Sequence, residues 1–302
     1  MGDRHRGGSD LSLIRLLVRR GEPCYTTAMK SGLTYPLGDR ASVLFSGGTD
    51  STLAAYEIAV RTRETTLLTL DPGFIFFVEN SRRHADLLRQ KIGADRVRHE
   101  IIPIRPLIRQ ILFGNLGHDV PKYGFNLTSL VCLGCRMSMH TAAVIYNLEH
   151  NIPVIADGSI QKQAEIPEQL ELFIRHNRRR LWARFGIRHY SPIYDVGNSD
   201  RRIDELGLST TPALKQQFIL FDTQPTCPFG VPADVYAKIF YGHLAGPARE
   251  VDTFEYSEEK YPTIYAAIER HFAGAEPGLE ALVNEARKVS DRLPESWEEI
   301  RG

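Results

Sequence analysis

The residues Ser46-Gly-Gly-Thr-Asp-Ser51 carry the strongest chemical signal in this 302-residue sequence. They follow a β-branched and aromatic run, Ala41-Ser-Val-Leu-Phe45, and precede a stretch of helical composition at 52–63. Two successive glycines after a strand let a ligand approach the backbone without meeting a Cβ atom. The unpaired N–H groups and the positive end of the following helix point to the same place. The pattern therefore predicts a site for a phosphate or pyrophosphate group.

This glycine loop differs from two common phosphate-binding motifs. It lacks the Gly-Lys-Ser/Thr ending of a Walker loop and the spaced third glycine of a dinucleotide fingerprint. The hydroxyls of Ser46, Thr49 and Ser51 can add hydrogen-bond donors. Asp50 has two available roles, capping the loop or helping to place a magnesium ion, and the sequence does not separate them.

The cysteines form a second set of candidate ligands. Cys132 and Cys135 are separated by two residues, so both sulfurs can reach one metal ion or each other. Cys227 lies between prolines in the segment 225–230, which would fix its position. Three thiolates can hold a [4Fe–4S] cluster with one iron left open, whereas four would close a structural zinc site or a fully ligated cluster. Cys24 is interpreted as an ordinary thiol; as a fourth ligand it would favour zinc.

Charged residues near these motifs have competing interpretations. Asp157, at the end of an expected strand, can orient magnesium or a ribose, or cap the turn before Gly158. Arg136 and Lys162 lie close in sequence to the expected site and can neutralise phosphate charge. The histidines His84, His118 and His140 show no ligand spacing and are interpreted as surface or packing residues.

The densest positive run is 175–180, followed by Arg184 and Arg188. On a helix, Arg180, Arg184 and Arg188 would share one face. That face would suit an anionic acceptor such as an RNA backbone or a phosphorylated small molecule. The alternative is a solvated helix face with acidic neighbours.

Alternating apolar runs and helical stretches predict the elements that position these residues. We expect strands at 41–45, 66–70, 97–104 and 153–156, and helices at 52–63, 81–92 and 106–113. A further helix is expected to follow Cys132-Leu-Gly-Cys135 and to run through Glu149. Helical composition also marks 11–20, 163–185, 232–240 and 261–272, whereas 114–129 is expected to be a long loop of the kind that often carries function. The alternation predicts an α/β fold with a doubly wound, mainly parallel sheet and a smaller, mostly helical C-terminal region.

Composition excludes several classes of protein. The chain is 42% hydrophobic and 25% charged, which is typical of a globular protein rather than a disordered one. Lys plus Arg and Asp plus Glu both number 37, which argues against a protein that mainly coats nucleic acid. The longest apolar run, 73–78, is too short to cross a bilayer, and no signal peptide or membrane partner is expected. Four cysteines are too few for a disulfide scaffold, so we expect a cytoplasmic protein.

The loop from Ser46 to Ser51 matches the Ser-Gly-Gly-x-Asp-Ser signature, so the chain resembles the PP-loop (N-type) ATP pyrophosphatases, whose fold is of the adenine nucleotide α-hydrolase type. This resemblance implies that ATP is split between its α- and β-phosphates, AMP passes to an acceptor and pyrophosphate leaves. It also implies that Leu70 and Asp71 lie against the adenine. The residues that would hold the pyrophosphate are Ser46, Gly47, Gly48, Thr49, Asp50 and Ser51.

The cysteines narrow the resemblance to the sulfur-transferring branch of that family. This branch includes tRNA thiolation enzymes and the sacrificial sulfur insertases of nickel-pincer cofactor assembly, and some members carry an extra sulfide on the open iron of a [4Fe–4S] cluster. The resemblance covers about residues 40–230. The matching pieces are Cys132, Cys135, Asp157-Gly158, Ser191-Pro192, Glu205-Leu-Gly-Leu208 and Cys227.

We therefore predict an ATP-dependent sulfurtransferase with Asp50 and Asp157 as catalytic residues and Cys132, Cys135 and Cys227 as metal ligands. Its cofactors would be ATP, Mg²⁺ and a [4Fe–4S] cluster, with Zn²⁺ as the alternative. The acceptor is a small molecule or a tRNA, and the sulfur donor and a homo-oligomeric state stay open. The alternatives are an amide- or nitrile-forming ligase with structural zinc, and a non-catalytic nucleotide-binding zinc module. The expected regions are an N-terminal extension at 1–39, the PP-loop domain at 40–195 and a C-terminal region at 196–302.

Overall fold

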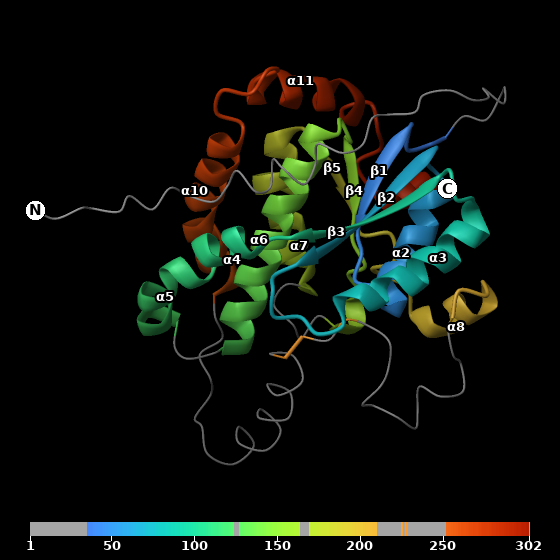
Figure 1. The fold of residues 1–302 in the computed structure, drawn as a ribbon, viewed down its shortest axis with the longest axis horizontal. Coiled ribbons are helices and arrows are strands. Elements are labelled where there is room, and N and C mark those ends of the chain that lie inside the picture. Colours follow the sequence, from blue (N-terminus) through green and yellow to red (C-terminus); the bar gives the residue numbers. More distant parts are fainter. Residues whose placement is uncertain are drawn as a thin grey trace, which may run out of the picture. The chain divides into compact units, whose positions relative to one another are not determined.

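Five parallel strands form one sheet in the order β3-β2-β1-β4-β5 (Figure 1). The strands are β1 Arg40–Leu44, β2 Glu64–Asp71, β3 Val97–Pro103, β4 Val154–Ala156 and β5 Arg188–Tyr190. Strand β1 lies in the middle, with β2 on one side and β4 on the other, so the chain changes direction across the sheet beside β1. Ligands of doubly wound sheets bind at such a point, outside the carboxyl ends of the strands. The predicted fold class is confirmed.

The computed structural model describes residues 35–123, 127–163, 169–209, 225, 227–228 and 252–301. These residues belong to one compact unit, Tyr35–Gly302. The expected helices at 11–20 and 232–240, and Cys24, lie outside the described residues. The division expected at residue 195 stays a prediction.

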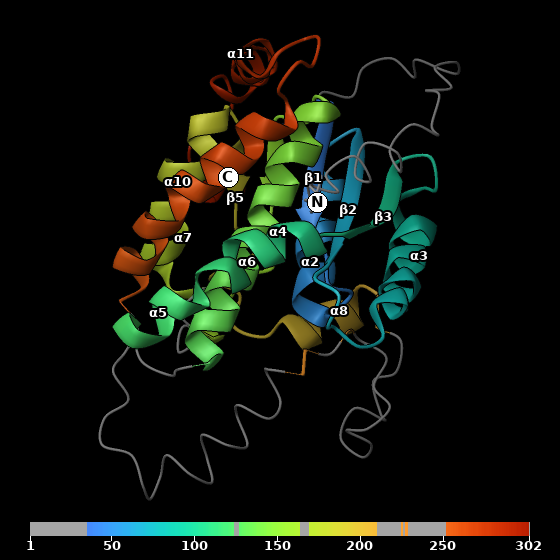
Figure 2. The same ribbon diagram turned by 60° about the vertical axis from the view of Figure 1, so that its left-hand side comes forward.

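Helices cover both faces of the sheet (Figures 1 and 2). One face carries α2 Thr49–Ala59, α3 Ser81–Ile92, α8 Ser199–Glu205 and α12 Trp297–Arg301. The other carries α4 Arg105–Ile111, α5 Leu116–Tyr123, α6 Leu127–Glu149, α7 Glu171–Asn177, α10 Thr253–His271 and α11 Leu279–Ser290. Short helical turns complete the set: η1 Val78–Asn80, η2 Phe113–Asn115, η3 Gln161–Gln163, the π-helix η5 Arg178–Trp182 and η6 Ala183–Phe185.

The strands feed two separate hydrophobic cores because successive side chains point to opposite faces. In β2, Leu67 packs in the core under α2 and α3, whereas Leu68 packs in the core under α4 and α6. In β4, Val154 joins the first core and Ile155 the second. Burial on both faces explains why these strands read as continuous apolar runs in the sequence.

The segment 114–129, expected to be a loop, instead contains helix α5 and the start of α6. Leu116, Val120 and Tyr123 recur at helical spacing and pack against the core under α4 and α6. Three glycines and a proline in the segment favoured a loop, but burial of this apolar face stabilises the helix. The expectation of a long functional loop was therefore wrong.

The predicted clustering of arginines on one helix face was also wrong. Arg180 lies in the π-helix η5 and pairs with Glu258 of α10 at 2.7 Å. Arg184 lies over a tyrosine ring of α10, with its guanidinium carbon 4.2 Å from the ring centroid. Arg188 is part of β5, a strand that the sequence did not indicate, and donates to the last carbonyl of α11 at 2.9 Å. The three arginines join the C-terminal helices to the sheet layer.

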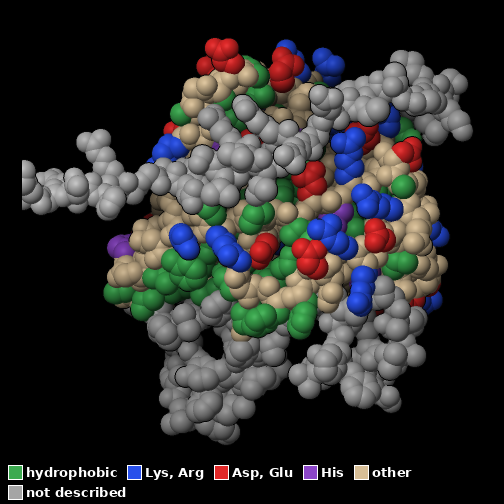
Figure 3. All heavy atoms as spheres, in the orientation of Figure 1, with side chains coloured by type: hydrophobic (Ala, Val, Ile, Leu, Met, Phe, Trp, Pro, Cys, Tyr) green, Lys and Arg blue, Asp and Glu red, His purple; other side chains and the backbone are tan. Residues whose placement is uncertain are grey.

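On the face of the molecule seen in Figure 3, acidic and basic side chains are interspersed, so no large area of this face carries charge of a single sign. This mixture agrees with the formal net charge of zero. Among the helices of the described residues, none has the length and apolar composition needed to cross a bilayer.

Candidate active site

The glycine loop links β1 to α2 and depends on one glycine in particular. Gly47 has φ +77°, a region that side chains other than glycine rarely adopt. A Cβ atom at Gly47 would lie 2.6 Å from the Cα of Ser81, the first residue of α3. The loop therefore passes directly over the N-terminus of α3. Gly48 follows as the N-cap of α2 in an extended conformation.

Hydroxyl groups hold the loop in shape. The Ser51 hydroxyl donates to the Gly48 carbonyl at 3.0 Å and accepts from the Ser46 N–H at 3.2 Å. The Thr52 hydroxyl donates to the same Gly48 carbonyl at 2.8 Å. These bonds position the first turn of α2, whose N–H groups then face outward to a ligand.

A cavity of about 710 Å³ opens at this loop, within the size range of small-molecule sites. The C-terminal ends of β1 and β2 line it together with the loop, and α6, η3 and the start of α8 line the rest. The lining residues are Leu44, Phe45, Ser46, Gly48, Thr49, Asp50, Ser51, Leu68, Thr69, Leu70, Ile75, Val78, Arg136, Met139, Gly158, Ile160, Lys162, Gln163, Gln169, Asn198, Ser199, Asp200 and Pro225.

Six of the eight predicted nucleotide-binding residues line this cavity. The other two support its walls: Gly47 sits over α3, and Asp71 accepts a hydrogen bond from the Gly73 N–H at 2.7 Å in a tight turn. Asp50 faces the cavity and accepts a hydrogen bond from the hydroxyl of Ser199. Helix α8 thus closes the site from the C-terminal part of the chain, which no motif in the sequence indicated.

Asp157 is buried behind the cavity rather than among its lining residues. One carboxylate oxygen accepts from Arg136 Nη2 at 2.6 Å and lies 3.2 Å from His189 Nε2; the other accepts from the Ser159 N–H at 3.2 Å. Burial raises the pKa of Asp157, but His189 and the charge of Arg136 outweigh it and hold the pKa below its usual range. Arg136 lines the cavity, so Asp157 anchors a permanent positive charge where phosphates would lie.

The imidazole behind Asp157 is neutral. Burial lowers the pKa of His189, and because a carboxylate only accepts, Nε2 carries the proton that His189 donates to Asp157. The indole of Trp182 stacks on His189 with ring centroids 5.5 Å apart, and His140 lies 6.5 Å from it. Within the described residues, His189 Nδ1 and His140 Nε2 are buried without a hydrogen-bond partner. His140 is a packing residue, as predicted.

His99 supports the floor of the cavity and makes the fold sensitive to acid. The Thr69 hydroxyl donates to the Phe45 carbonyl at 2.7 Å, so it accepts from His99 Nε2 at 2.8 Å. Burial and the positive charges of Arg82 and Arg89 lower the pKa of His99 from 6.5 to about 4. The unfolded chain therefore binds a proton that the folded chain does not, as pH falls from about 6.5 to 4.

We predict that His99→Gln flattens the pH dependence of stability in that window. The contribution of His99 is fully present above pH 6.5 and is lost as pH falls toward 4, so the variant should lose less stability between pH 7.5 and 5 than the wild type does. Urea midpoints at the two pH values measure the difference. Equal slopes for His99→Gln and the wild type would contradict the assignment.

Cys132 and Cys135 lie one turn apart within α6, not before it as expected. Both are half-buried, and none of the described cysteines forms a disulfide with another. Arg136 and Met139 follow at helical spacing and line the cavity. The two thiols therefore continue the cavity face of α6 toward the N-terminus of the helix.

Cys227 lies two residues after Pro225, which lines the same cavity. Two residues span at most about 7 Å, so Cys227 is near the cavity mouth. Among the described residues, the three cysteine sulfurs are not all within 4.8 Å of one another. Sulfurs around one tetrahedral zinc ion stand about 3.8 Å apart. The arrangement is thus not that of a preformed zinc site on these three thiols.

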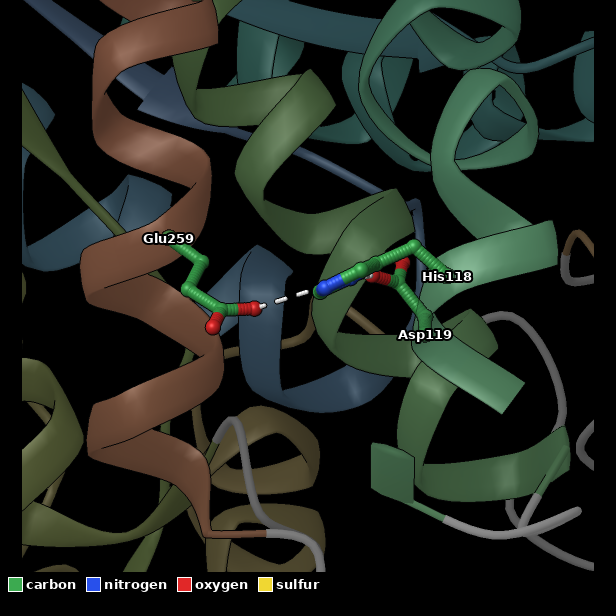
Figure 4. Close-up of side chains that lie close together, drawn as sticks. All are labelled: His118, Asp119 and Glu259. Atoms are coloured by element: carbon green, nitrogen blue, oxygen red, sulfur yellow. Dashed lines mark hydrogen bonds and ion pairs between the residues drawn. The ribbon is translucent and has the colours of Figure 1, made fainter. Parts of the chain in front are cut away.

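A second group of ligand-type side chains joins α5 to α10. His118, Asp119 and Glu259 bring three ligand atoms within 4.8 Å of one another (Figure 4). Both carboxylates already carry a cation, because Lys260 pairs with Asp119 at 2.5 Å and Lys122 pairs with Glu259. The group is therefore an ion-pair cluster, and a metal ion would have to displace a lysine.

Comparisons with known proteins add little to these observations. No family model matches the chain, and no curated protein matches it. One similar solved structure is that of a predicted subunit of a tRNA methyltransferase from Methanocaldococcus jannaschii, with 19% identity and a TM-score of 0.38. The similarity covers 56% of this chain and 75% of the other. At that level it assigns no function.

Proposed function

We propose that the chain is an ATP pyrophosphatase that adenylylates an oxygen of an acceptor and then exchanges AMP for sulfur. One observation carries the proposal. The glycine loop, with Gly47 held at φ +77°, stands at the carboxyl end of the central strand β1 and faces a cavity large enough for a nucleotide. The cysteine-bearing face of α6 continues from the same cavity.

The chain supplies groups for each charge that develops in the first reaction. An acceptor oxygen attacks the α-phosphorus, the bond from this phosphorus to the bridging oxygen breaks, and pyrophosphate leaves with the electron pair. The N–H groups at the start of α2 and the hydroxyl of Ser46 would hold the leaving pyrophosphate, while Ser51 keeps the loop in shape. Arg136, oriented by Asp157, and Lys162 would neutralise phosphate oxygens.

A magnesium ion fits the donor set of the cavity. Two carboxylates, Asp50 and Asp200, line it, and Mg²⁺ prefers carboxylate and phosphate oxygens. Asp50 would help to place the ion while the Ser199 hydroxyl holds its carboxylate. The leucines at the end of β2, Leu68 and Leu70, offer an apolar wall for the adenine.

In the second reaction a sulfide displaces AMP from the activated carbon, so a carbon–sulfur bond forms and the carbon–oxygen bond to AMP breaks. Cys132, Cys135 and Cys227 would hold a [4Fe–4S] cluster, which supplies sulfide on an iron without a protein ligand. The position of all three near the cavity supports this assignment. Asp157 would act by positioning Arg136.

Pyrophosphate release from ATP tests the first reaction. The assay would use anaerobically purified protein, with RNA and small-molecule fractions of a cell extract as acceptors. We expect Asp50→Ala to lower the rate at least about 100-fold through loss of phosphate and metal positioning, and Cys227→Ala to keep pyrophosphate release but lose sulfur transfer. Asp39→Ala, at a carboxylate that is 73% exposed, is the matched control. Absence of pyrophosphate release with every acceptor would refute the proposal.

Metal content tests the cysteine assignment separately. About four iron and labile sulfide per chain, lost in Cys227→Ala, are expected. One zinc and no iron would make the cysteines structural and leave a nitrogen nucleophile as the partner of the adenylate.

A further inference from the structure

Two phenylalanines stand exposed beside the cavity. Phe76 and Phe77 have exposed fractions of 57% and 64%, and their ring centroids are 6.4 Å apart. Their neighbours in the chain, Ile75 and Val78, both line the cavity. Because adjacent Cα atoms are 3.8 Å apart, the backbone of both phenylalanines runs along the edge of the cavity. Exposed aromatic groups next to a pocket mark a binding surface more often than a packing defect.

The backbone at Phe77 is strained. It adopts φ 59° and ψ 33°, the left-handed region that bulky residues rarely occupy. Phe77 and Asn151 are the described non-glycine residues with positive φ, and asparagine tolerates this region. A glycine would suit the Phe77 backbone better, and the ring itself gains little burial. Strain of this kind gathers at ligand sites, so the ring points to a ligand.

Three cations lie on segments that border the cavity or adjoin the two phenylalanines in the fold. Lys162 lines the cavity, Arg83 lies in the first turn of α3, and Arg105 begins α4. The Arg105 side chain covers Gly73, where a Cβ atom would lie 2.2 Å from its Nε. All three are exposed, and none makes an ion pair within the part of the chain that the structure describes. Their charge is therefore available to phosphates.

We propose that Phe76 and Phe77 form a stacking platform for an unpaired base of single-stranded RNA, whose phosphates meet Arg83 and Arg105. Aromatic rings flanked by cations hold single strands by base stacking and backbone contacts. A second protein would favour an apolar surface around the rings, whereas exposed cations lie on the neighbouring segments. This inference rests on the proposed function only where it identifies the stacked nucleotide as the acceptor. RNA binding itself needs no ATP.

Fluorescence anisotropy with a labelled 12-nucleotide single-stranded RNA of mixed sequence, without ATP, tests the platform. Phe76→Ala and Phe77→Gly should each weaken binding about five- to 150-fold, the effect of removing one stacked base. Phe113→Ala, at an aromatic residue that is 42% exposed on η2, is the control and should bind like the wild type. Arg83→Gln should lower the slope of log affinity against log salt by about 0.7.

Folding is separated from binding by thermal melting, because Phe77→Gly relieves the strained backbone and should melt no lower than the wild type. Failure of the wild type to bind RNA at physiological salt would overturn the inference. The inference would also be overturned if the phenylalanine variants lost ATP affinity but kept RNA affinity, because the rings would then contact adenine. A wild-type dimer that dissociates in Phe76→Ala would overturn it as well. The proposed function fails differently: RNA binds normally, but no pyrophosphate is released.

Discussion

Replacement of Gly47 by alanine should abolish ATP binding and lower pyrophosphate release by at least about 100-fold, the cost of an active-site displacement near 1 Å. The new Cβ would lie 2.6 Å from the Cα of Ser81, a backbone atom that no rotamer change can move. The residue would also have to keep φ +77°. Either the loop or the start of α3 must therefore shift, and the N–H groups of α2 move with the loop. Calorimetric titration with ATP and the pyrophosphate assay measure the two effects.

Gly38 offers a matched control for this variant. It has φ +80°, but a Cβ atom there would meet nothing within 4 Å. Gly38→Ala should therefore destabilise the fold by about 1 kcal/mol through backbone strain alone and leave ATP affinity unchanged. Adding Ser81→Gly to Gly47→Ala should restore nothing, because the contact is with the Cα atom. A Gly47→Ala protein with wild-type turnover would show that the loop does not hold the phosphates.

The sheet and the phosphate loop were predictable because their signals are local. The helix at 81–92 has the predicted bounds, with Gly93 ending it, and the first three strands lie within two residues of the predicted positions. Each of these predictions depends on apolar spacing or turn residues within about a dozen positions. The boundary between β1 and the glycine loop is also predicted by local signals, because the strand must end where the glycines begin.

The remaining parts of the site depend on contacts between distant residues. Ser199 reaches Asp50 across 149 positions, and no local pattern in α8 indicates that its first turn meets the loop. Asp157 kept several possible roles in the sequence, and only the fold shows that its partners are Arg136 and His189. The sequence indicated Arg136 only because it lies close in sequence to the expected site. The packing of α6 on the sheet determines which residues of this helix face the cavity.

In the C-terminal helices, contacts that stabilise the fold also depend on distant residues and could not be predicted from local sequence patterns. The helix expected at 261–272 begins eight residues earlier, at Thr253, where the Asp252 carboxylate accepts from the N–H groups of Phe254 and Glu255. The early turns of this helix bury Lys260, a residue that sequence patterns place on a surface. Its burial is explained by Asp119, a partner 141 positions away.

Lys260→Ala should therefore be strongly destabilising, by about 3–5 kcal/mol. The ammonium lies 2.5 Å from an Asp119 oxygen, and the two side chains are only 2% and 1% exposed. Removing the lysine leaves the Asp119 carboxylate buried between α5 and α10 without the ammonium that pairs with it. For a chain of this size, that loss lowers Tm by roughly 6–20 °C, which differential scanning calorimetry would measure.

Lys122 provides the comparison, because it joins the same two helices at the surface. It pairs with Glu255 at 2.6 Å and with Glu259, but its side chain is 32% exposed, so Lys122→Ala should change Tm little. The double variant Asp119→Leu with Lys260→Met removes both buried charges and should recover most of the stability that Lys260→Ala loses. If the double variant were as unstable as Lys260→Ala, the loss would come from packing around Lys260 and not from the Asp119 carboxylate left without its lysine.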